Sequence, residues 1–116
     1  PWEDGVGLQK YFDFMAKYFP EGDKMDTVNT YGYSTAQLLV QVLKQCGDDL
    51  TRENVMRQTA NLKNFELPML LPDIRIDTGP TDYSPVEQMQ LQRFDGKQWV
   101  LFGEIISPRG GKSPRS

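Results

Sequence analysis

The sequence from Asn29 to Gly47 reads as one long amphipathic helix, and the rest of the chain has to pack around it. Apolar residues recur at i, i+3, i+4 and i+7, the spacing that lines one face of an α-helix: Ala36, Leu39, Val40 and Leu43. Val42 and Cys46 widen this stripe, so we expect more than one side of the helix to be covered. Gly47 is the residue expected in the left-handed position that ends a helix.

Two further helices are predicted, one on each side of the first in the sequence. Residues 5–19 place apolar and aromatic side chains at helical spacing, which is more typical of a core face than of a binding face: Leu8, Tyr11, Phe12, Met15 and Tyr18. Thr51 is a good N-cap for a helix over 51–64, and Pro68 prevents its continuation. With the central helix at 30–46, the sequence predicts about three helices.

A short strand is predicted over 73–77, where Ile74 and Ile76 alternate with polar residues. Prolines are frequent on both sides of this segment, and proline cannot donate a hydrogen bond within a sheet. We therefore expect an edge strand or a crossover segment.

A β-hairpin is predicted over 86–94 and 97–106, because these segments flank Asp95-Gly96, a strong hairpin signal. With a two-residue turn, Phe94 faces Lys97. Leu91 then faces Val100 and Met89 faces Phe102, which makes one apolar face.

The other face of this hairpin carries Trp99 and Leu101, for which the chain offers no obvious cover. The central helix is also apolar over too broad an arc for one sheet face. Both features indicate part of a larger fold, or a protomer that associates. The start at Pro1, without a targeting segment, indicates a processed or truncated piece, and residues 107–116 are expected to form a flexible tail.

Composition excludes several classes of function. The chain of 116 residues is enough for one domain, and it contains no histidine and one cysteine, Cys46. Histidine-based catalytic triads and the usual zinc sites are therefore excluded, as is an intrachain disulfide. The acidic balance of residues 1–106 argues against a nucleic-acid backbone as partner. No apolar run is long enough to span a membrane.

The order of these elements, with several local sequences, resembles the C-terminal part of a type I periplasmic solute-binding protein, from the branched-chain amino-acid-binding family of ABC transporter receptors. The resemblance covers nearly all of residues 1–106. Its strongest parts are Tyr31-Gly32-Tyr33 with Ala36 at the start of the central helix, Gly47 at its end, and the run Phe94-Asp95-Gly96-Lys97.

The resemblance implies an α/β fold with two doubly wound lobes, linked by three crossovers, and a solute in the cleft between them. Closure of the cleft on the solute is the signal that the membrane permease reads. This chain would supply only the last quarter to third of such a receptor. Residues 1–65 would belong to the first lobe and 66–106 to a crossover and the hairpin. The implied protein is periplasmic and uses no cofactor, metal or catalytic residue.

The resemblance also implies candidate site residues. The start of the central helix lies near the cleft in this family, which corresponds here to Asn29, Thr30 and Tyr31. A tyrosine there can stack on a ligand, but it can equally fasten the helix to the sheet, as Tyr33 is expected to do. The third crossover would fall near four residues: Leu71, Pro72, Asp73 and Ile74. The solute itself stays open among amino acids, amides and aromatic or aliphatic carboxylates.

Two other functions remain as alternatives. The same two-lobed fold also serves as a ligand-sensing regulatory domain, and the sequence does not separate this from a transport receptor. A small enzyme is the second alternative, in which carboxylates would act without histidine. Its candidate acids are Asp48, Asp49, Asp77, Asp82 and Glu104, although adjacent acids at a helix start are more often caps. As a lone piece, the chain is expected to self-associate and not to bind solute.

Overall fold

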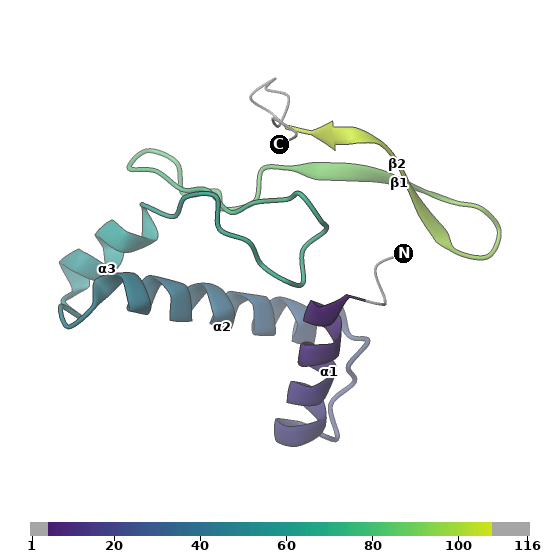
Figure 1. Cartoon of the computed structure of the whole chain (residues 1–116), viewed down its shortest axis with the longest axis horizontal. Helices are drawn as coiled ribbons and strands as arrows, with labels where there is room; N and C mark the ends of the chain where they lie inside the picture. Colours follow the sequence, from purple (N-terminus) through teal and green to yellow (C-terminus); the bar gives the residue numbers. More distant parts are fainter. Residues whose placement is uncertain (1–4, 108–116) are drawn as a thin grey trace.

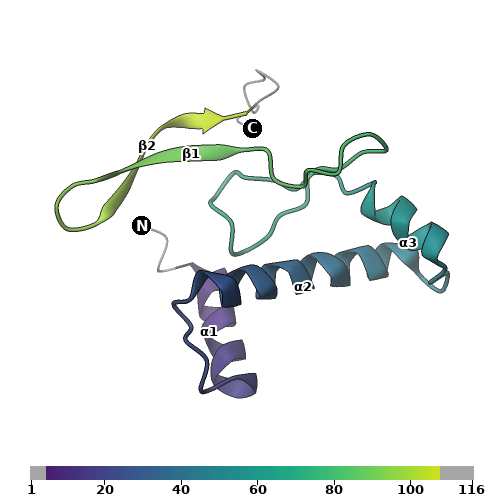
Figure 2. The ribbon, with the colours of Figure 1, turned by 180° about the vertical axis from the view of Figure 1, so that it is seen from behind.

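The computed structural model of the chain describes residues 5–107, and in this range three helices precede one β-hairpin. The elements are α1 (Val6–Tyr18), α2 (Thr27–Cys46), α3 (Arg52–Thr59), β1 (Met89–Phe94) and β2 (Trp99–Ile106). In Figures 1 and 2, α2 is the long axis of the helical part, with α1 projecting from its N-terminal end and α3 lying at its C-terminal end. This mixture of helices and strands confirms the predicted α/β class. The tail predicted at 107–116 lies outside the described residues except for Ser107.

Helix α2 begins at Thr27, earlier than the predicted start at residue 30. Asp26 is its N-cap, and the carboxylate oxygen of Asp26 accepts a hydrogen bond from the Val28 N–H at 2.8 Å. An aspartate in this position satisfies an N–H that has no partner inside the helix. At the other end, Gly47 has a φ of 59°, as predicted for the residue that ends the helix.

Helix α3 is shorter than the predicted span of 51–64 and ends at Thr59. Thr51 is the N-cap, as predicted, and its hydroxyl accepts a hydrogen bond from the Asn54 N–H at 3.3 Å. The early end has a cause far along the sequence. The buried Thr78 hydroxyl donates to the Thr59 carbonyl at 2.6 Å and accepts from the Leu62 N–H at 2.9 Å. These bonds hold the chain in a turn where local propensity would extend the helix.

The prediction of a strand over 73–77 is wrong. The segment makes one isolated antiparallel bridge, in which Ile76 and Phe65 exchange two backbone hydrogen bonds of 3.0 and 2.8 Å. Asp73 has a φ of 68°, a left-handed conformation that interrupts an extended chain. Only the burial of Ile74 and Ile76 follows the predicted alternation.

The hairpin is present, but its register is shifted from the prediction. Phe94 pairs with Trp99, so the connection between the strands is longer than the predicted two residues. The Asp95 carboxylate accepts from the backbone N–H groups of Lys97 and Gln98 at 2.8 and 2.9 Å, which holds this longer turn. Leu91 faces Phe102, and an irregularity between Met89 and Leu91 places Met89 opposite Ile106. The shift near the turn is by two residues, so each side chain keeps the face that was predicted for it.

The hairpin leaves both of its faces accessible to solvent. Trp99 is 54% exposed, and most of the apolar side chains on the two strands are exposed as well. Figure 1 shows the hairpin extending away from the helices. The radius of gyration of 16.3 Å is accordingly larger than the roughly 13 Å expected for a compact domain of this length. The chain does not bury its hairpin.

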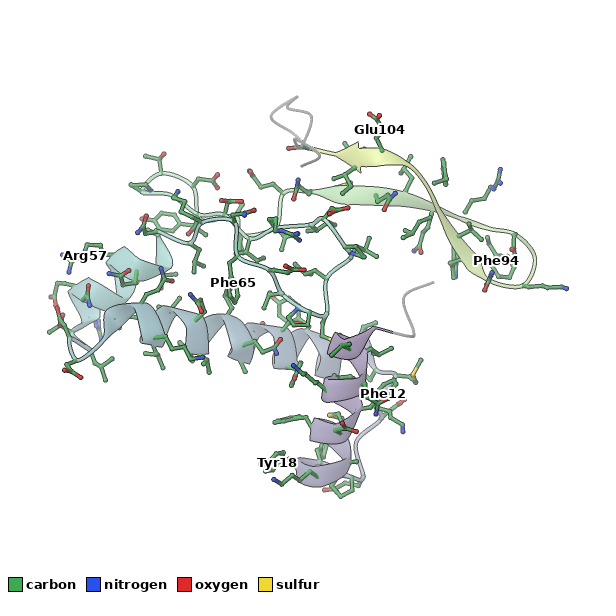
Figure 3. The ribbon with its side chains drawn as sticks, viewed as in Figure 1. Phe12, Tyr18, Arg57, Phe65, Phe94 and Glu104 are labelled. Atoms are coloured by element: carbon green, nitrogen blue, oxygen red, sulfur yellow. The ribbon has the colours of Figure 1, made fainter. Side chains whose placement is uncertain are left out.

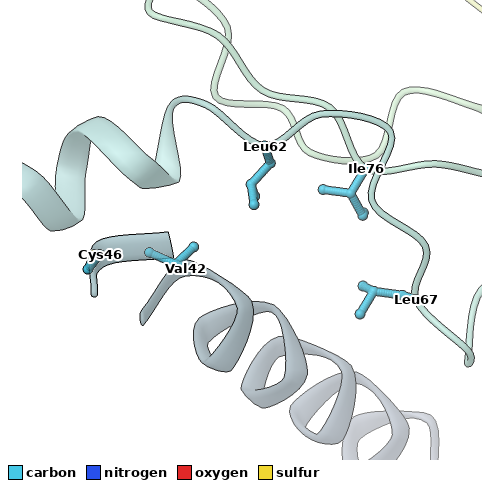
Figure 4. Close-up of a cluster of buried hydrophobic side chains, with 5 residues drawn as sticks. All are labelled: Val42, Cys46, Leu62, Leu67 and Ile76. Atoms are coloured by element: carbon cyan, nitrogen blue, oxygen red, sulfur yellow. The ribbon is translucent and has the colours of Figure 1, made fainter. Parts of the chain in front are cut away.

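The core lies between α2 and the connection from 60 to 78. Figure 4 shows its five buried side chains, which point toward one another from these two parts of the chain: Val42, Cys46, Leu62, Leu67 and Ile76. Four partly buried side chains pack around this cluster: Leu38, Val55, Phe65 and Leu70. The core is small, and long-range contacts hold it together.

The apolar stripe predicted on α2 does not form this core. Ala36, Leu39, Val40 and Leu43 are all exposed, and the helix buries Val42 and Cys46 instead. The prediction of a helix with a broad apolar surface is confirmed, but the covered side was assigned wrongly. Local spacing indicates that a helix is amphipathic and does not indicate which part of a broad stripe the chain itself covers.

We predict that acid weakens this fold through two turn aspartates. The Thr51 hydroxyl and N–H hold the pKa of Asp49 below its usual value of 3.8, and the N–H groups of Gln98 and Lys97 do the same for the pKa of Asp95. A lowered pKa in the folded state stabilises the fold above pH 3.8, and this stabilisation is lost as the pH falls through the lowered value. Urea denaturation at several pH values from about 5 downward measures this slope.

Asp49→Ala and Asp95→Ala should each reduce this acid dependence, and the double variant should reduce it further. Asp13→Ala is the matched control, since the Asp13 carboxylate accepts a bond only from an exposed glutamine, Gln9. If the two turn variants keep the full acid slope of the parent chain, the turn carboxylates are not its source.

Candidate functional site

A groove of about 730 Å³ lies between α1, α2 and the segment from Phe65 to Pro68. Its walls are mostly apolar and aromatic, which is typical of ligand-binding sites. The lining residues are Phe14, Met15 and Phe19 from α1, a face of α2 from Val28 to Lys44, and Phe65, Glu66 and Pro68. In Figure 3, Phe65 reaches from the connection toward α2.

Of the three residues predicted at the start of the central helix, only Asn29 lines the groove. Its side-chain amide donates to the Asp23 carbonyl at 2.9 Å, which fixes its position in the first turn of α2. The Thr30 hydroxyl donates back to the Asp26 carbonyl at 3.3 Å and does not line the groove. Tyr31 is 75% exposed and also lies outside it.

Tyr33 fastens α2 to α1. Its ring centroid lies 5.2 Å from that of Tyr11 and 5.1 Å from that of Phe14, and Tyr11 is fully buried. Aromatic pairs at these distances contribute packing energy beyond their buried area. The expected structural role of Tyr33 is therefore correct, although its contacts are to a helix and not to a sheet. Tyr31 makes no ring contact among the described residues.

The predicted crossover residues form a tight turn. The Ile74 N–H donates to the Leu71 carbonyl at 3.2 Å, and Asp73 between them has the positive φ of 68°. Ile74 is buried while Pro72 and Asp73 are exposed. A non-glycine residue rarely adopts this conformation, so the turn is a defined bend of the backbone.

The groove also contains polar groups that the sequence analysis does not single out. Gln37, Gln41 and Lys44 from α2 line it, and Gln37 and Gln41 are partly buried. The Gln37 Oε1 atom is buried and has no hydrogen-bond partner within residues 5–107. Glu66 lies across from them, and its carboxylate is 3.8 Å from the Arg75 guanidinium. Only the position of the groove, a tertiary feature, reveals these residues.

Three of the five candidate carboxylates of the enzyme alternative accept hydrogen bonds within the fold. Asp49 accepts from the Thr51 hydroxyl at 2.7 Å and Asp77 from the Asn64 N–H at 2.9 Å. Asp82 accepts from the Ser84 N–H at 3.1 Å, and Glu104 is exposed on the hairpin in Figure 3. Over residues 5–107, no three acidic or cysteine side chains gather as metal ligands would. None of the described helices combines the length and apolarity that crossing a membrane requires.

A comparison with protein families matches the chain to the periplasmic binding proteins over residues 1–98. Searches of curated proteins and of solved structures return no match. The matched range contains α1, α2, α3, β1 and the groove, and the observed mixture of helices and a hairpin is consistent with part of this fold. Proteins of this family bind solutes, and the family is named for its periplasmic members. The chain belongs to the periplasmic binding protein family.

Proposed function

We propose that this chain is part of the solute-binding component of an ABC uptake system for amino acids or related small carboxylates and amides. Family membership over residues 1–98 is the observation that carries this proposal. The protein would act in the periplasm and deliver its solute to a membrane permease. Residues 1–65 would belong to one lobe, and 66–106 to a crossover and the hairpin.

The groove supports a solute of this class. Apolar and aromatic walls suit the carbon skeleton of an amino acid, and the polar groups at the groove are few. Lys44 offers a cation for a carboxylate, Glu66 an anion for an ammonium group, and Asn29 an amide that both donates and accepts. Thr30 and Tyr31 do not line the groove, so they would contact the solute only if the second wall of the cleft held it beside them.

The turn at Leu71–Ile74 is the proposed hinge. A bend that places Asp73 at a φ of 68° gives the chain a defined change of direction between the helical part and the hairpin. Hinge closure in two-domain receptors is absorbed by a few such positions outside regular elements.

We predict that the chain of 116 residues, titrated alone with amino acids and aromatic acids, shows no micromolar binding by calorimetry. A cleft requires two walls, and the groove in this chain is open. The full receptor polypeptide that we propose to contain this chain should bind one of these solutes. Micromolar affinity in the isolated chain would contradict the need for a second wall.

In that receptor, Asn29→Ala should weaken solute binding by about 5- to 150-fold, because a buried polar contact to the ligand is worth about 1–3 kcal/mol. Asn61→Ala is the matched control, since Asn61 is exposed just beyond α3 and is not among the residues that line the groove. Equal affinities for the two variants would remove Asn29 from the site.

We also propose that the chain self-associates. The exposed apolar side chains of α2 and of the hairpin are more than single scattered residues, and contiguous apolar surface of this kind marks an interaction site.

A further inference from the structure

The extended segment around Ile76 is bonded along one side to the helical part of the molecule. Ile76 and Phe65 exchange two backbone hydrogen bonds, of 3.0 and 2.8 Å. The Thr78 N–H donates to the Leu62 carbonyl at 3.0 Å, and the Thr78 hydroxyl donates to the Thr59 carbonyl at 2.6 Å. Ile76 and Thr78 are both buried. This side of the segment is therefore fixed to the same core as α2.

The other side of this segment faces the residues that lead into the hairpin. In an extended chain the backbone groups of successive residues point to opposite sides, so the N–H groups of Arg75 and Asp77 point away from Phe65. The Asp77 N–H donates to the Pro85 carbonyl at 3.4 Å, and the Arg75 N–H donates to the side-chain oxygen of Gln88 at 3.0 Å. The segment thus links the helical part on one side to the base of the hairpin on the other.

The Gln88 side chain takes the place of a backbone partner. In a regular antiparallel ladder the bonded pairs advance by two residues on each strand. After the bond from Asp77 to Pro85, the regular acceptor for the Arg75 N–H would be the Glu87 carbonyl. The Gln88 amide oxygen accepts this bond instead, and β1 begins at the next residue. The regular pattern is therefore interrupted just before the hairpin, and a side chain makes the link there.

The hairpin itself is held mainly by its own two strands. β1 and β2 form a two-stranded sheet, and Figures 1 and 2 show this sheet extending away from the helices. Most of its apolar side chains are exposed. Parts of a protein with few buried apolar contacts move at a low cost in free energy. The direction of the hairpin therefore depends on the contacts at its base.

We propose that residues 86–88 form a joint between the helical part and the hairpin, and that the Gln88 amide is the latch of this joint. These residues belong to no helix or strand, and they lie between Pro85 and the start of β1. While Gln88 accepts from the Arg75 N–H, the hairpin keeps the direction that the structure shows. When this bond opens, the hairpin rotates as one body with its strands still paired. The joint follows the proposed hinge at 71–74 in the chain and adds a second place to turn.

Amide hydrogen exchange of the 116-residue chain, measured residue by residue by NMR without solute, tests the latch. Gln88→Ala should speed exchange of the Asp77 amide by about 2- to 13-fold, the population change that corresponds to one net hydrogen bond. The Asp77 N–H reports on the joint because its bond to Pro85 crosses it. The Ile76 N–H bonds to Phe65 inside the helical part and should exchange at the parent rate.

Gln90→Ala is the matched control. Gln90 lies two residues further along, and its amide donates to the Gly103 carbonyl at 2.9 Å, within the hairpin. This variant should leave exchange of the Asp77 amide within about twofold of the parent rate. Gln88→Glu keeps an acceptor for the Arg75 N–H and should also stay within about twofold.

Unchanged exchange of the Asp77 amide in Gln88→Ala overturns the latch, and so does an equal rise in Gln90→Ala. An equal rise at the Ile76 amide overturns it as well, because Gln88 would then stabilise the whole fold and not the joint. None of these results depends on solute binding, which the titrations of the chain and of the receptor test separately.

Residual dipolar couplings test whether the hairpin rotates as one body. In the parent chain, one alignment tensor should fit the helical part and the hairpin together. In Gln88→Ala, the couplings of β1 and β2 should become smaller than those of α2, while cross-strand nuclear Overhauser effects show that the strands stay paired. Couplings that keep the parent ratio in Gln88→Ala overturn the joint, and so does loss of the strand pairing.

Discussion

Ile76→Ala should lower the free energy of unfolding by about 2–5 kcal/mol, the largest loss that we expect from a single side chain of this protein. Ile76 is buried to 1% exposure and lies in the cluster with Leu62, Leu67, Val42 and Cys46. Its backbone is held by two hydrogen bonds to Phe65, so the surrounding chain has little freedom to close a cavity. A cavity that does not collapse makes such a substitution more destabilising than the lost transfer energy alone.

Because the core is small, the loss at Ile76 is a large fraction of the free energy of unfolding. Domains are typically stable by about 5–15 kcal/mol, and here one five-residue cluster joins α2 to the connection. Urea denaturation of dilute protein, where the chain is monomeric, measures the change. Ile76→Val should lose only about 0.5–1.5 kcal/mol, since it removes one methylene. Ile106→Ala, at a position 46% exposed on the hairpin, should lose less than about 1 kcal/mol. Similar losses at Ile76 and Ile106 would contradict the position of the core.

The elements of this fold follow from local signals, whereas their limits and contacts do not. Asp95-Gly96 predicts a hairpin, but the sequence alone does not distinguish a two-residue turn from the longer one that the Asp95 carboxylate holds. Thr51 predicts the start of α3 correctly, and its end depends on Thr78, which is distant in sequence. Ile74 and Ile76 alternate as in a strand, yet Asp73 at a positive φ leaves only one bridge.

The candidate site was predictable only in part, for a geometric reason. The sequence places Asn29, Thr30 and Tyr31 together at the start of the central helix. Because Asp26 caps the helix, all three lie within its first turns, where successive residues point about 100° apart. Three consecutive helical residues therefore do not line one groove, and only Asn29 does so. Gln37 and Lys44 also line the groove. Tertiary packing brings them there, and the spacing of residues along the helix does not predict it.

Asn54→Ala should lower the free energy of unfolding by about 1–3 kcal/mol, although Asn54 itself belongs neither to the groove lining nor to the main cluster. Asn54 is buried in α3, and its amide donates to the Asp49 carbonyl at 2.8 Å and to the Cys46 carbonyl at 3.4 Å. These carbonyls lie at the end of α2 and just beyond it, where a helix leaves its last C=O groups without internal partners. The side-chain oxygen Oδ1 of Asn54 accepts from the Arg57 guanidinium at 2.6 Å and from the Gln58 amide at 3.3 Å.

One side chain thus caps the end of α2 and organises the polar side of α3. Removal of the amide takes one donor from the Cys46 carbonyl, which keeps the Asp49 N–H at 3.3 Å, and takes the Asn54 donor from the partly buried Asp49 carbonyl. The loss of these bonds is the main source of the expected destabilisation. Asn54→Asp separates the two functions of the amide, because a carboxylate keeps the acceptor for Arg57 and loses both donors. It should destabilise the fold by an amount close to that of Asn54→Ala if the capped carbonyls matter most. Asn61→Ala, at an exposed position, should change stability by less than about 0.5 kcal/mol. If Asn54→Asp keeps full stability in urea denaturation, the destabilisation by Asn54→Ala comes from the lost bonds to Arg57 and Gln58. The angle between α2 and α3 would then not depend on the bonds from Asn54 to the carbonyls at the end of α2.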